Sequence, residues 1–520
     1  MTKEEKGKVS FFILFGVPII SWFLAIKYTE ILVRPKIKHL YYLATHTNTE
    51  DKPILFYALV GGVILGFVFT FLFNKLVDSD AFSGAPFKKF FRGSKLVTAN
   101  KLAAMTRERK SKSKTKKKRE QVQVSGVPLP EAAEQRHLLI SGATGVGKSV
   151  AFKELAYHCL LRGDRIAVVD PNGDMLSKFY RPGDYILNPF DERTEGWTFF
   201  NEIRSDFDYD RYTLSMIPRG STSDVEEWRS YARLLVAETA RKLAMTSKSC
   251  SIEEVFRWTN TEDVENLQKF LAGTPAEALF VGADKALASA RFVLSSILPA
   301  NLVMPTGGYS IRRWIEDKSA GNLFITWRED MAYKIKPLIS SWIDIICTTM
   351  LSLPENKADP LWLFLDELAS LEKLPSLEAA LTKGRKSGLR VVAGLQSTAQ
   401  LNSIYGKEEA QSLRSCFRSL FVLGGSNTDP ETCEEMSRCL GDHEVERDKK
   451  SHTHGSKNKS KNTSPERNKE RIVLPSEISN LPDLQGYLAI TGNLPVAKVE
   501  LEPINFKNRT EAFIENQFRS

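Results

Sequence analysis

The chain has 520 residues, of which 42% are hydrophobic, and a formal net charge of +9. This composition argues against a wholly disordered chain and allows one large or two medium domains. The positive charge is concentrated in residues 1–119, which carry +15, whereas the remaining 401 residues carry −6. The body of the chain therefore needs a local basic patch if it binds nucleic acid. Six cysteines without a CxxC pair predict free thiols in a reducing compartment and no structural metal.

Two apolar stretches near the N-terminus are long enough to cross a membrane. Val9–Ile26 contains 18 consecutive uncharged residues and Ile54–Phe73 contains 20. As helices with a rise of about 1.5 Å per residue, both can cross a hydrocarbon core of about 30 Å, the first only just. No small-residue cleavage site follows the first stretch, so a removed signal peptide is the weaker interpretation. Residues 1–80 are therefore predicted to form an anchor with two retained transmembrane helices.

The orientation of this anchor follows from the basic residues that flank it. The segment 75–119 carries 15 Lys and Arg residues, against five in the intervening loop 27–53. Because the more basic flank stays in the cytoplasm, we expect both termini and the bulk of the chain to be cytoplasmic and the short loop to be periplasmic. Residues 81–124 are predicted to be a basic cytoplasmic linker. Its densest part, 107–119, could contact solvent, anionic lipid or DNA.

A strand-like run, His137–Ile140, leads into a motif of the form GxxxxGK[ST]. The glycines let backbone N–H groups turn toward phosphate oxygens at the start of a helix, where the helix dipole favours an anion. Lys148 is then expected to reach the β- and γ-phosphates of ATP, and the Ser149 hydroxyl to bind Mg²⁺. The residues expected to cradle the nucleotide are Gly142, Ala143, Thr144, Gly145, Val146, Gly147, Lys148 and Ser149.

A second apolar run, Leu361–Leu365, ends in the acidic pair Asp366 and Glu367. A continuous apolar strand is typical of a buried parallel sheet, and ligands bind at the carboxyl ends of such strands. Asp366 is therefore predicted to hold Mg²⁺ through water, and Glu367 to polarise the water that attacks ATP. An acidic pair after a strand can also be a helix cap, and its combination with the P-loop is what favours catalysis.

Three further polar positions follow predicted strands or turns. Gln396, after the apolar run Leu389–Leu395, could sense the γ-phosphate, although a turn glutamine bonded to backbone is the alternative. Arg385 lies in a basic turn and could reach the nucleotide of a neighbouring subunit, although a solvated turn fits the sequence equally well. Asp170 ends the strand-like run Arg165–Asp170 and is a plausible neighbour of these residues, without an assigned role.

The character of the sequence changes between the two halves of this site. Residues 196–312 lack strand-like runs and show helical spacing, so we expect an all-α domain inserted into an α/β domain made of 125–195 and 313–520. Residues 443–471 are polar, rich in Lys, Asn and Ser, and without a period, which predicts a mobile loop. The expected fold is thus an α/β, RecA-like P-loop NTPase domain with an all-α insertion, preceded by two transmembrane helices.

Taken in this order, the motifs resemble those of the type IV coupling proteins of conjugation and type IV secretion, the TraD/TrwB type. The resemblance covers nearly the whole chain and depends most on the motif around the acidic pair. The matching sequences are Gly126-Val127-Pro128, Asn188-Pro189-Phe190-Asp191, Leu365-Asp366-Glu367-Leu368-Ala369-Ser370-Leu371, Gly384-Arg385-Lys386, Gly394-Leu395-Gln396-Ser397 and Leu484-Gln485-Gly486-Tyr487.

The resemblance implies more than the residues do by themselves. It implies a motor in the bacterial inner membrane that hydrolyses ATP with Mg²⁺ and assembles as a homo-hexamer. Such a motor moves DNA, with a single strand favoured and a relaxase attached, toward the proteins of a secretion channel. By position, Lys148, Ser149, Asp366 and Glu367 would serve hydrolysis. Gln396 would couple hydrolysis to the interior of the ring, and Arg385 would act across the subunit interface.

Two other functions are open at this stage. A chromosome-segregation DNA pump of the FtsK type is also a membrane-tethered RecA-like hexamer. It usually has more membrane spans and a C-terminal winged helix, and this sequence shows neither. The second alternative is a substrate-docking receptor with a non-essential nucleotide site, which the complete set of Lys148, Ser149, Asp366 and Glu367 disfavours.

Overall fold

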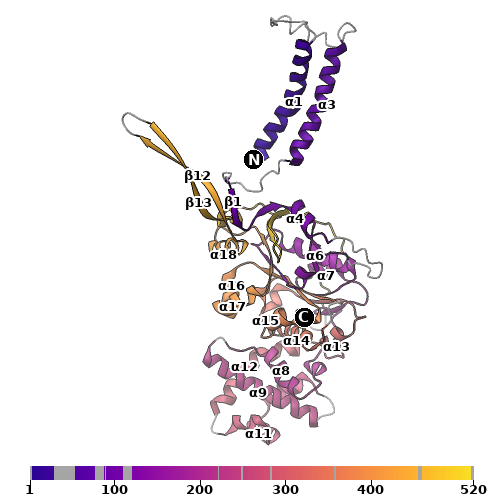
Figure 1. Ribbon diagram of the computed structural model, residues 1–520. Coiled ribbons are helices and arrows are strands. Elements are labelled where there is room, and N and C mark those ends of the chain that lie inside the picture. Colours follow the sequence, from indigo (N-terminus) through magenta and orange to yellow (C-terminus); the bar gives the residue numbers. More distant parts are fainter. Residues whose placement is uncertain are drawn as a thin grey trace. The chain divides into compact units, whose positions relative to one another are not determined.

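The computed structural model describes residues 3–28, 53–76, 87, 89–108, 120–220, 222–246, 250–281, 284–355, 359–454 and 459–516 (Figure 1). The chain divides into two compact units. The first comprises residues 1–92 and 444–469, and the second comprises 93–443 and 470–520. All residues of the predicted nucleotide site belong to the second unit.

The first unit contains two long apolar helices, α1 (Lys3–Tyr28) and α3 (Pro53–Leu76). Both are long and apolar enough to cross a membrane. They pack closely, because a Cβ atom added at Gly62 of α3 would lie only 2.8 Å from the Cα atom of Pro18 in α1. Small residues at such contacts allow two membrane helices to approach one another. Most of the predicted loop between them, 29–52, lies outside the described residues.

Residues 443–471, predicted to be a mobile loop, instead form most of two paired strands. A three-stranded sheet of order β1-β12-β13 is made by β1 (Lys89–Gly93), β12 (Asp442–His454) and β13 (Lys459–Arg471). The Glu444 carboxylate bonds to both Arg92 and Arg467, and the Arg467 guanidinium lies 4.4 Å from the centroid of the Phe91 ring. The loop prediction is wrong because these strands are held by backbone pairing and charge contacts, which leave no apolar alternation in the sequence.

Part of the predicted linker 81–124 is also folded. Strand β2 (Leu96–Thr98) pairs in parallel with β15 (Val496–Glu500) and is followed by helix α4 (Ala99–Thr106). Leu102 of α4 is completely buried. The linker prediction fails here because net charge does not report the few apolar side chains that pack. Residues 109–119, the densest basic part, lie outside the described residues.

The second unit is built on a ten-stranded sheet of order β2-β15-β14-β11-β5-β10-β9-β6-β8-β7. The strands from β11 to β7 run parallel, whereas β14 is antiparallel to both of its neighbours. The strands of this sheet not yet introduced are β5 (Leu138–Ser141), β6 (Arg165–Pro171), β7 (Tyr185–Leu187), β8 (Leu323–Trp327), β9 (Leu361–Leu365), β10 (Leu389–Leu395), β11 (Ser419–Leu423) and β14 (Gln485–Ala489). The short pair β3 (Gln123–Val124) and β4 (Val127–Pro128) precedes it.

Helices cover both faces of this sheet because its central strands are apolar on both sides. In β9, Leu361, Leu363 and Leu365 belong to one hydrophobic core, whereas Trp362 and Phe364 belong to the other. The first core packs against α14 and the second against α6 and α7. The helices of this part are α5 (Glu131–Glu134), α6 (Lys148–Arg162), α7 (Asp174–Phe179), α14 (Ala332–Ser352), α15 (Leu377–Lys383), α16 (Thr398–Tyr405), α17 (Lys407–Ser415), α18 (Pro430–Leu440) and α19 (Pro475–Ser479).

Between β7 and β8 the described residues form a helical block, which lies beyond one end of the sheet (Figure 1). Its apolar core is continuous with that of the sheet face covered by α14, and Trp197 packs edge-on against Trp342 of α14 with 5.8 Å between ring centroids. The domain boundaries at 195 and 313 stay a prediction. The helices of the block are α8 (Phe207–Met216), α9 (Ser223–Thr246), α10 (Ile252–Phe256), α11 (Val264–Leu271), α12 (Asp284–Leu302) and α13 (Ile311–Glu316).

Candidate nucleotide site

The GxxxxGK[ST] motif forms the turn between strand β5 and helix α6, at the carboxyl edge of the sheet. Gly145 and Gly147 have φ angles of 85° and 113°, which a residue with a Cβ atom rarely adopts. Gly147 is also confined, since an added Cβ would lie 2.8 Å from the Leu484 Cδ2 atom. The turn therefore places the N-terminus of α6 at the end of a buried strand, which is the arrangement that binds phosphate in P-loop proteins.

The side chain of Lys148 folds back onto the P-loop and bonds to its backbone. Its Nζ atom donates hydrogen bonds to the Gly142 carbonyl at 2.8 Å and to the Ala143 carbonyl at 3.0 Å. Burial lowers the pKa of Lys148, and the nearby carboxylates of Glu367 and Asp366 oppose that shift. The structure thus brings the P-loop lysine and the acidic pair together, although 217 residues of sequence lie between Lys148 and Asp366.

Asp366 and Glu367 follow β9, which lies between β10 and β6 in the sheet. Asp366 Oδ1 and Glu367 Oε2 are buried and have no hydrogen-bond partner among the described residues. Burial raises the pKa of both carboxyls, to about 7 for Glu367, and the positive charge of Lys148 opposes the shift. A buried acceptor without a partner is costly to a fold and is typical of a site that binds a ligand.

The backbone around the acidic pair is tightly packed against strand β10. A Cβ atom added at Gly394 would lie 1.8 Å from the Asp366 carbonyl oxygen, so only glycine allows the two strands to keep this contact. The register of β10 and β9, in which Ala393 is opposite Leu365, places Gly394 beside Asp366. This glycine belongs to the motif that contains Gln396, and its packing role explains why the motif begins with glycine.

Asp170 ends β6, the other neighbour of β9. The pairing of Val169 with Leu365 places Asp170 beside Asp366. Burial raises the pKa of Asp170 to about 7, and its Oδ2 atom accepts a hydrogen bond at 2.9 Å from the backbone N–H of Leu176 in α7. The sequence predicts this strand and its acid but assigns no role. The structure makes Asp170 a third carboxyl at the same edge and a cap for α7.

Gln396 and Arg385 lie near opposite ends of β10. At the carboxyl end, Thr144 of the P-loop donates a hydrogen bond at 3.3 Å to Gln396 Oε1, and the sensor role of Gln396 stays a prediction. Arg385 is exposed in the turn before β10. Seven strand residues at about 3.3 Å each separate these ends, roughly 20 Å. The structure therefore brings Gln396 to the nucleotide motif of its own chain but does not bring Arg385 there.

The residues present suit a nucleotide with Mg²⁺. Ser149 lies exposed in the first turn of α6, and Asp366 has a buried oxygen without a hydrogen bond. The described residues contain no group of three or more His, Cys, Asp or Glu side chains that could hold a metal ion by themselves. Mg²⁺ differs from most metals in keeping water and phosphate ligands, so one hydroxyl and one carboxylate are enough to bind it together with a nucleotide.

Comparison with known proteins identifies the family. The family model for the type IV secretion-system coupling protein DNA-binding domain matches residues 121–502, more than half of the chain. The chain belongs to the type IV secretion coupling protein family. The family prediction from the motifs and the α/β fold class are thereby confirmed.

Solved structures and curated relatives agree with this assignment. The bacterial conjugative coupling protein TrwBΔN70 is 58% identical, superimposes with a TM-score of 0.78, and the match covers 84% of this chain and 99% of TrwBΔN70. A TrwB structure in complex with ADP and Mg²⁺ matches with a TM-score of 0.77, over 84% of this chain and 100% of that one. Coupling protein TraD of Escherichia coli (strain K12) is 30% identical over 398 residues, which are 73% of this chain and 54% of TraD. The chain therefore spans about half the length of this curated relative.

Proposed function

We propose that this coupling protein is an ATP-hydrolysing motor that moves a relaxase-bound DNA strand to a type IV secretion channel during bacterial conjugation. One observation carries the enzymatic part of this proposal: Lys148 lies beside two buried carboxyls whose Asp366 Oδ1 and Glu367 Oε2 atoms have no hydrogen bond among the described residues. The TrwB structure with ADP and Mg²⁺ supports a nucleotide as the ligand. The family model, which describes a DNA-binding domain, supports DNA as the cargo.

Each residue of the site has a role that its position supports. The Lys148 ammonium supplies positive charge at the P-loop, and Ser149 and Asp366 would hold Mg²⁺, Asp366 through water. Glu367 accepts a proton from the attacking water, for which a pKa of about 7 is well matched at neutral pH. Mg·ATP, when bound, supplies the phosphoanhydride bond whose cleavage releases the free energy for movement. Gln396, bonded to Thr144, reports on the phosphate end of the site.

The proposed setting is the bacterial inner membrane, with α1 and α3 as a two-pass anchor and both chain termini in the cytoplasm. Two helices of sufficient length and apolar composition support the anchor. We also propose a homo-hexameric ring. Arg385 is compatible with such a ring: it is exposed at the edge of the sheet opposite to its own P-loop, so a role in hydrolysis would be directed at the nucleotide of a neighbouring subunit.

The proposal is tested with the full chain in lipid nanodiscs, by measuring ATP hydrolysis with and without single- and double-stranded DNA. Glu367→Gln should lower kcat by about 10²- to 10⁴-fold, because it removes the proton acceptor. Glu195→Gln is the matched control. Glu195 is a partly buried carboxyl whose pKa is also raised by burial, but it lies in the loop after β7, so its rate should not change.

Conjugative DNA transfer by cells that carry Lys148→Ala separates the motor from the docking receptor. A motor loses transfer when the P-loop lysine is removed, whereas a receptor with a non-essential nucleotide site keeps it. Wild-type protein that fails to bind Mg·ATP, or that hydrolyses it equally well after Glu367→Gln, would overturn the proposed activity.

A further inference from the structure

The six residues after the acidic-pair motif, 371–376, are fixed by hydrogen bonds to other elements. This segment begins one short 3₁₀ turn (Leu368–Ser370) after Glu367 and ends at Ser376, the residue before α15. Its backbone N–H groups at Glu372, Leu374 and Ser376 donate to Ser340 Oγ at 2.9 Å, Tyr405 Oη at 3.1 Å and Asp344 Oδ1 at 2.7 Å, respectively. A displacement of Glu367 that continues along the chain therefore meets these three contacts.

Asp344 of α14 connects this segment to the helical block. The side chain is almost completely buried, with an exposed fraction of 1%. Besides the N–H of Ser376, it accepts the Ser376 hydroxyl at 3.2 Å and the Ser215 hydroxyl at 2.5 Å, both at Oδ2. Ser215 lies in α8, the first helix of the block, and is equally buried. One carboxylate thus joins the end of the 371–376 segment to α8.

The same segment also contacts the element that carries the sensor. Tyr405, which receives the Leu374 N–H, is the last residue of α16, and α16 begins directly after Gln396 and Ser397. At its other end the segment leads into α15 and the turn that carries Arg385. The 371–376 segment is therefore linked to the helix that follows Gln396 and to the turn that carries Arg385. Asp344 connects it to α8.

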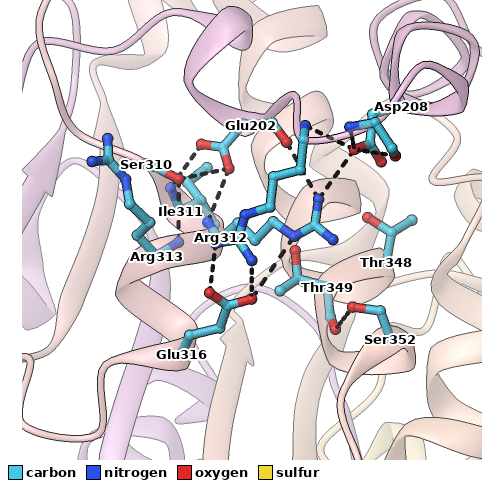
Figure 2. A network of polar contacts seen from close by, with 12 residues as sticks. Glu202, Asp208, Ser310, Ile311, Arg312, Arg313, Glu316, Thr348, Thr349 and Ser352 are labelled. Atoms are coloured by element: carbon cyan, nitrogen blue, oxygen red, sulfur yellow. Dashed lines mark hydrogen bonds and ion pairs between the residues drawn. The ribbon is translucent and has the colours of Figure 1, made fainter.

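A second buried carboxylate bonds two parts of the helical block to each other, away from the nucleotide site. Glu202 is completely buried and accepts hydrogen bonds from Ser310 Oγ at 3.0 Å and from the N–H groups of Ile311 at 2.7 Å and Arg312 at 3.0 Å. Figure 2 shows these groups converging on Glu202 at the start of α13. Its fourth donor is the Trp197 indole. All four partners lie in the block itself and none belongs to residues 366–385, so these bonds hold the block together without contacting the segment that follows Glu367.

We propose that Asp344 is a positioning residue that transmits the state of the nucleotide site to α8, through Ser376 on one side and Ser215 on the other. The inference rests on the proposed ATPase function. A buried carboxylate that lost one of its donors would be left partly unsatisfied, which is costly. Ser376 and Ser215 therefore move together with Asp344 when the segment shifts, and α8 moves with them.

The experiment uses the full chain in nanodiscs and four variants. Ser215→Ala removes one buried hydroxyl and with it the hydrogen bond of Asp344 to α8. Asp344→Asn alters the bonds to both Ser215 and Ser376. Ser341→Ala is the matched control for Ser215, because Ser341 is buried on α14 and, within the part of the chain that the structure describes, its hydroxyl bonds to the Leu338 carbonyl of its own helix alone. Glu202→Gln is the matched control for Asp344, because it alters a buried, hydrogen-bonded carboxylate whose partners all lie in the helical block.

The main measurement is hydrogen exchange across α8 with and without Mg²⁺ and a non-hydrolysable ATP analogue, which does not depend on turnover. Wild type, Ser341→Ala and Glu202→Gln should show the same change in α8 exchange on binding, and Ser215→Ala and Asp344→Asn should lose most of it. DNA stimulation of ATP hydrolysis should fall by about fivefold in the same two variants, the size of a typical coupling.

Several outcomes separate this inference from the proposed function. The inference is overturned if α8 exchange in wild type ignores the analogue. It is also overturned if Ser215→Ala keeps the full response, or if both control variants lose the response to the same degree. A wild-type chain that binds the analogue and changes α8 exchange, but hydrolyses no ATP, would instead overturn the proposed ATPase and leave the Asp344 connection intact.

Discussion

Two buried clusters of charge lie at opposite edges of the central sheet. At the amino edge, the Arg162 guanidinium bonds to Glu134 at 2.7 Å and to Asp164 at 2.5 Å, and Asp164 also accepts the Trp362 indole N–H at 2.9 Å. At the carboxyl edge, Lys148 donates to the backbone carbonyls of Gly142 and Ala143. Within the described residues, the two adjacent carboxyls each keep an unbonded oxygen.

One cluster has its hydrogen-bond partners within the chain and the other does not, which indicates a structural role for the first and a ligand-binding role for the second. Both have taken charge out of water, which costs free energy. The Arg162 cluster recovers that cost with partners inside the chain, so its residues serve the fold. In the Lys148 cluster, two carboxylate oxygens lack a partner among the described residues, so their desolvation is not offset within the chain. A ligand of complementary charge would supply the partners, and for this site that ligand is a nucleotide with Mg²⁺. The mutual bonds of Arg162, Glu134 and Asp164 and the unbonded carboxylate oxygens beside Lys148 therefore distinguish a structural cluster from a candidate active site. The buried Arg390 interacts with the same cluster as Arg162, and its Nε has no hydrogen bond among the described residues.

The largest expected effect is on the ATPase rate of a variant at Arg385. It tests whether this residue, at the amino edge of the sheet, acts on the nucleotide at the carboxyl edge of another subunit. Arg385→Ala should lower the ATPase rate by about 10³-fold, the lower end of the range for an arginine finger. Mixing Arg385→Ala chains with Glu367→Gln chains should recover part of the activity, because a mixed ring contains interfaces at which each neighbour supplies the residue that the other lacks. Activity that stays at the level of the separate variants would mean that Arg385 does not act between subunits.

Removing the Arg162 guanidinium should lower the stability of the fold without changing the ATPase rate. Arg162→Met keeps the aliphatic stem but leaves Glu134 and Asp164 buried without their cation, which should lower the free energy of unfolding by about 3–5 kcal/mol. Urea denaturation measures the loss, and the ATPase rate per folded molecule should stay within about twofold of wild type. Trp362→Phe is a graded control that removes one hydrogen bond and should cost about 1 kcal/mol. A large fall in rate at unchanged stability would assign the Arg162 cluster to the catalytic site.

The smallest expected effect is a pH dependence that belongs to the carboxyl edge. Because burial raises the pKa of Glu367 to about 7, its ionised, proton-accepting form is lost as pH falls below that value. The kcat/KM for ATP should then fall about tenfold per pH unit below 7. Stability should change in the opposite direction. A carboxyl with a raised pKa favours folding at low pH, and this contribution is lost as pH rises from about 4.5 to 7.

Asp170 provides the control for this pH profile, since burial raises its pKa to about 7 as well. Asp170→Asn removes that titration and leaves Glu367 in place, so the fall in kcat/KM below pH 7 should persist. A profile that becomes flat in Asp170→Asn would assign the titration to the third carboxyl instead.

Local sequence signals predicted the parts of the site whose geometry is local. The spacing of glycines before Lys148 determines a turn that few other residues can make. The short apolar run before Asp366 favours a buried strand, so both were recognisable without a structure. The same reasoning failed where contacts between residues far apart in the sequence determine the secondary structure. Strands β12 and β13 pair through polar residues, and Leu102 of α4 packs in a stretch that its charge suggested was a linker.

The sequence by itself determined the two apolar helices, the nucleotide motif and the family, because each depends on residue types at short, fixed spacings. Only the tertiary structure placed Lys148 beside Asp366 and Glu367, separated Arg385 from its own P-loop, and joined Ser215 to Ser376 through Asp344. Those relations depend on strand order and on helix packing between residues far apart in the chain, and no local pattern of side chains encodes a distance of that kind.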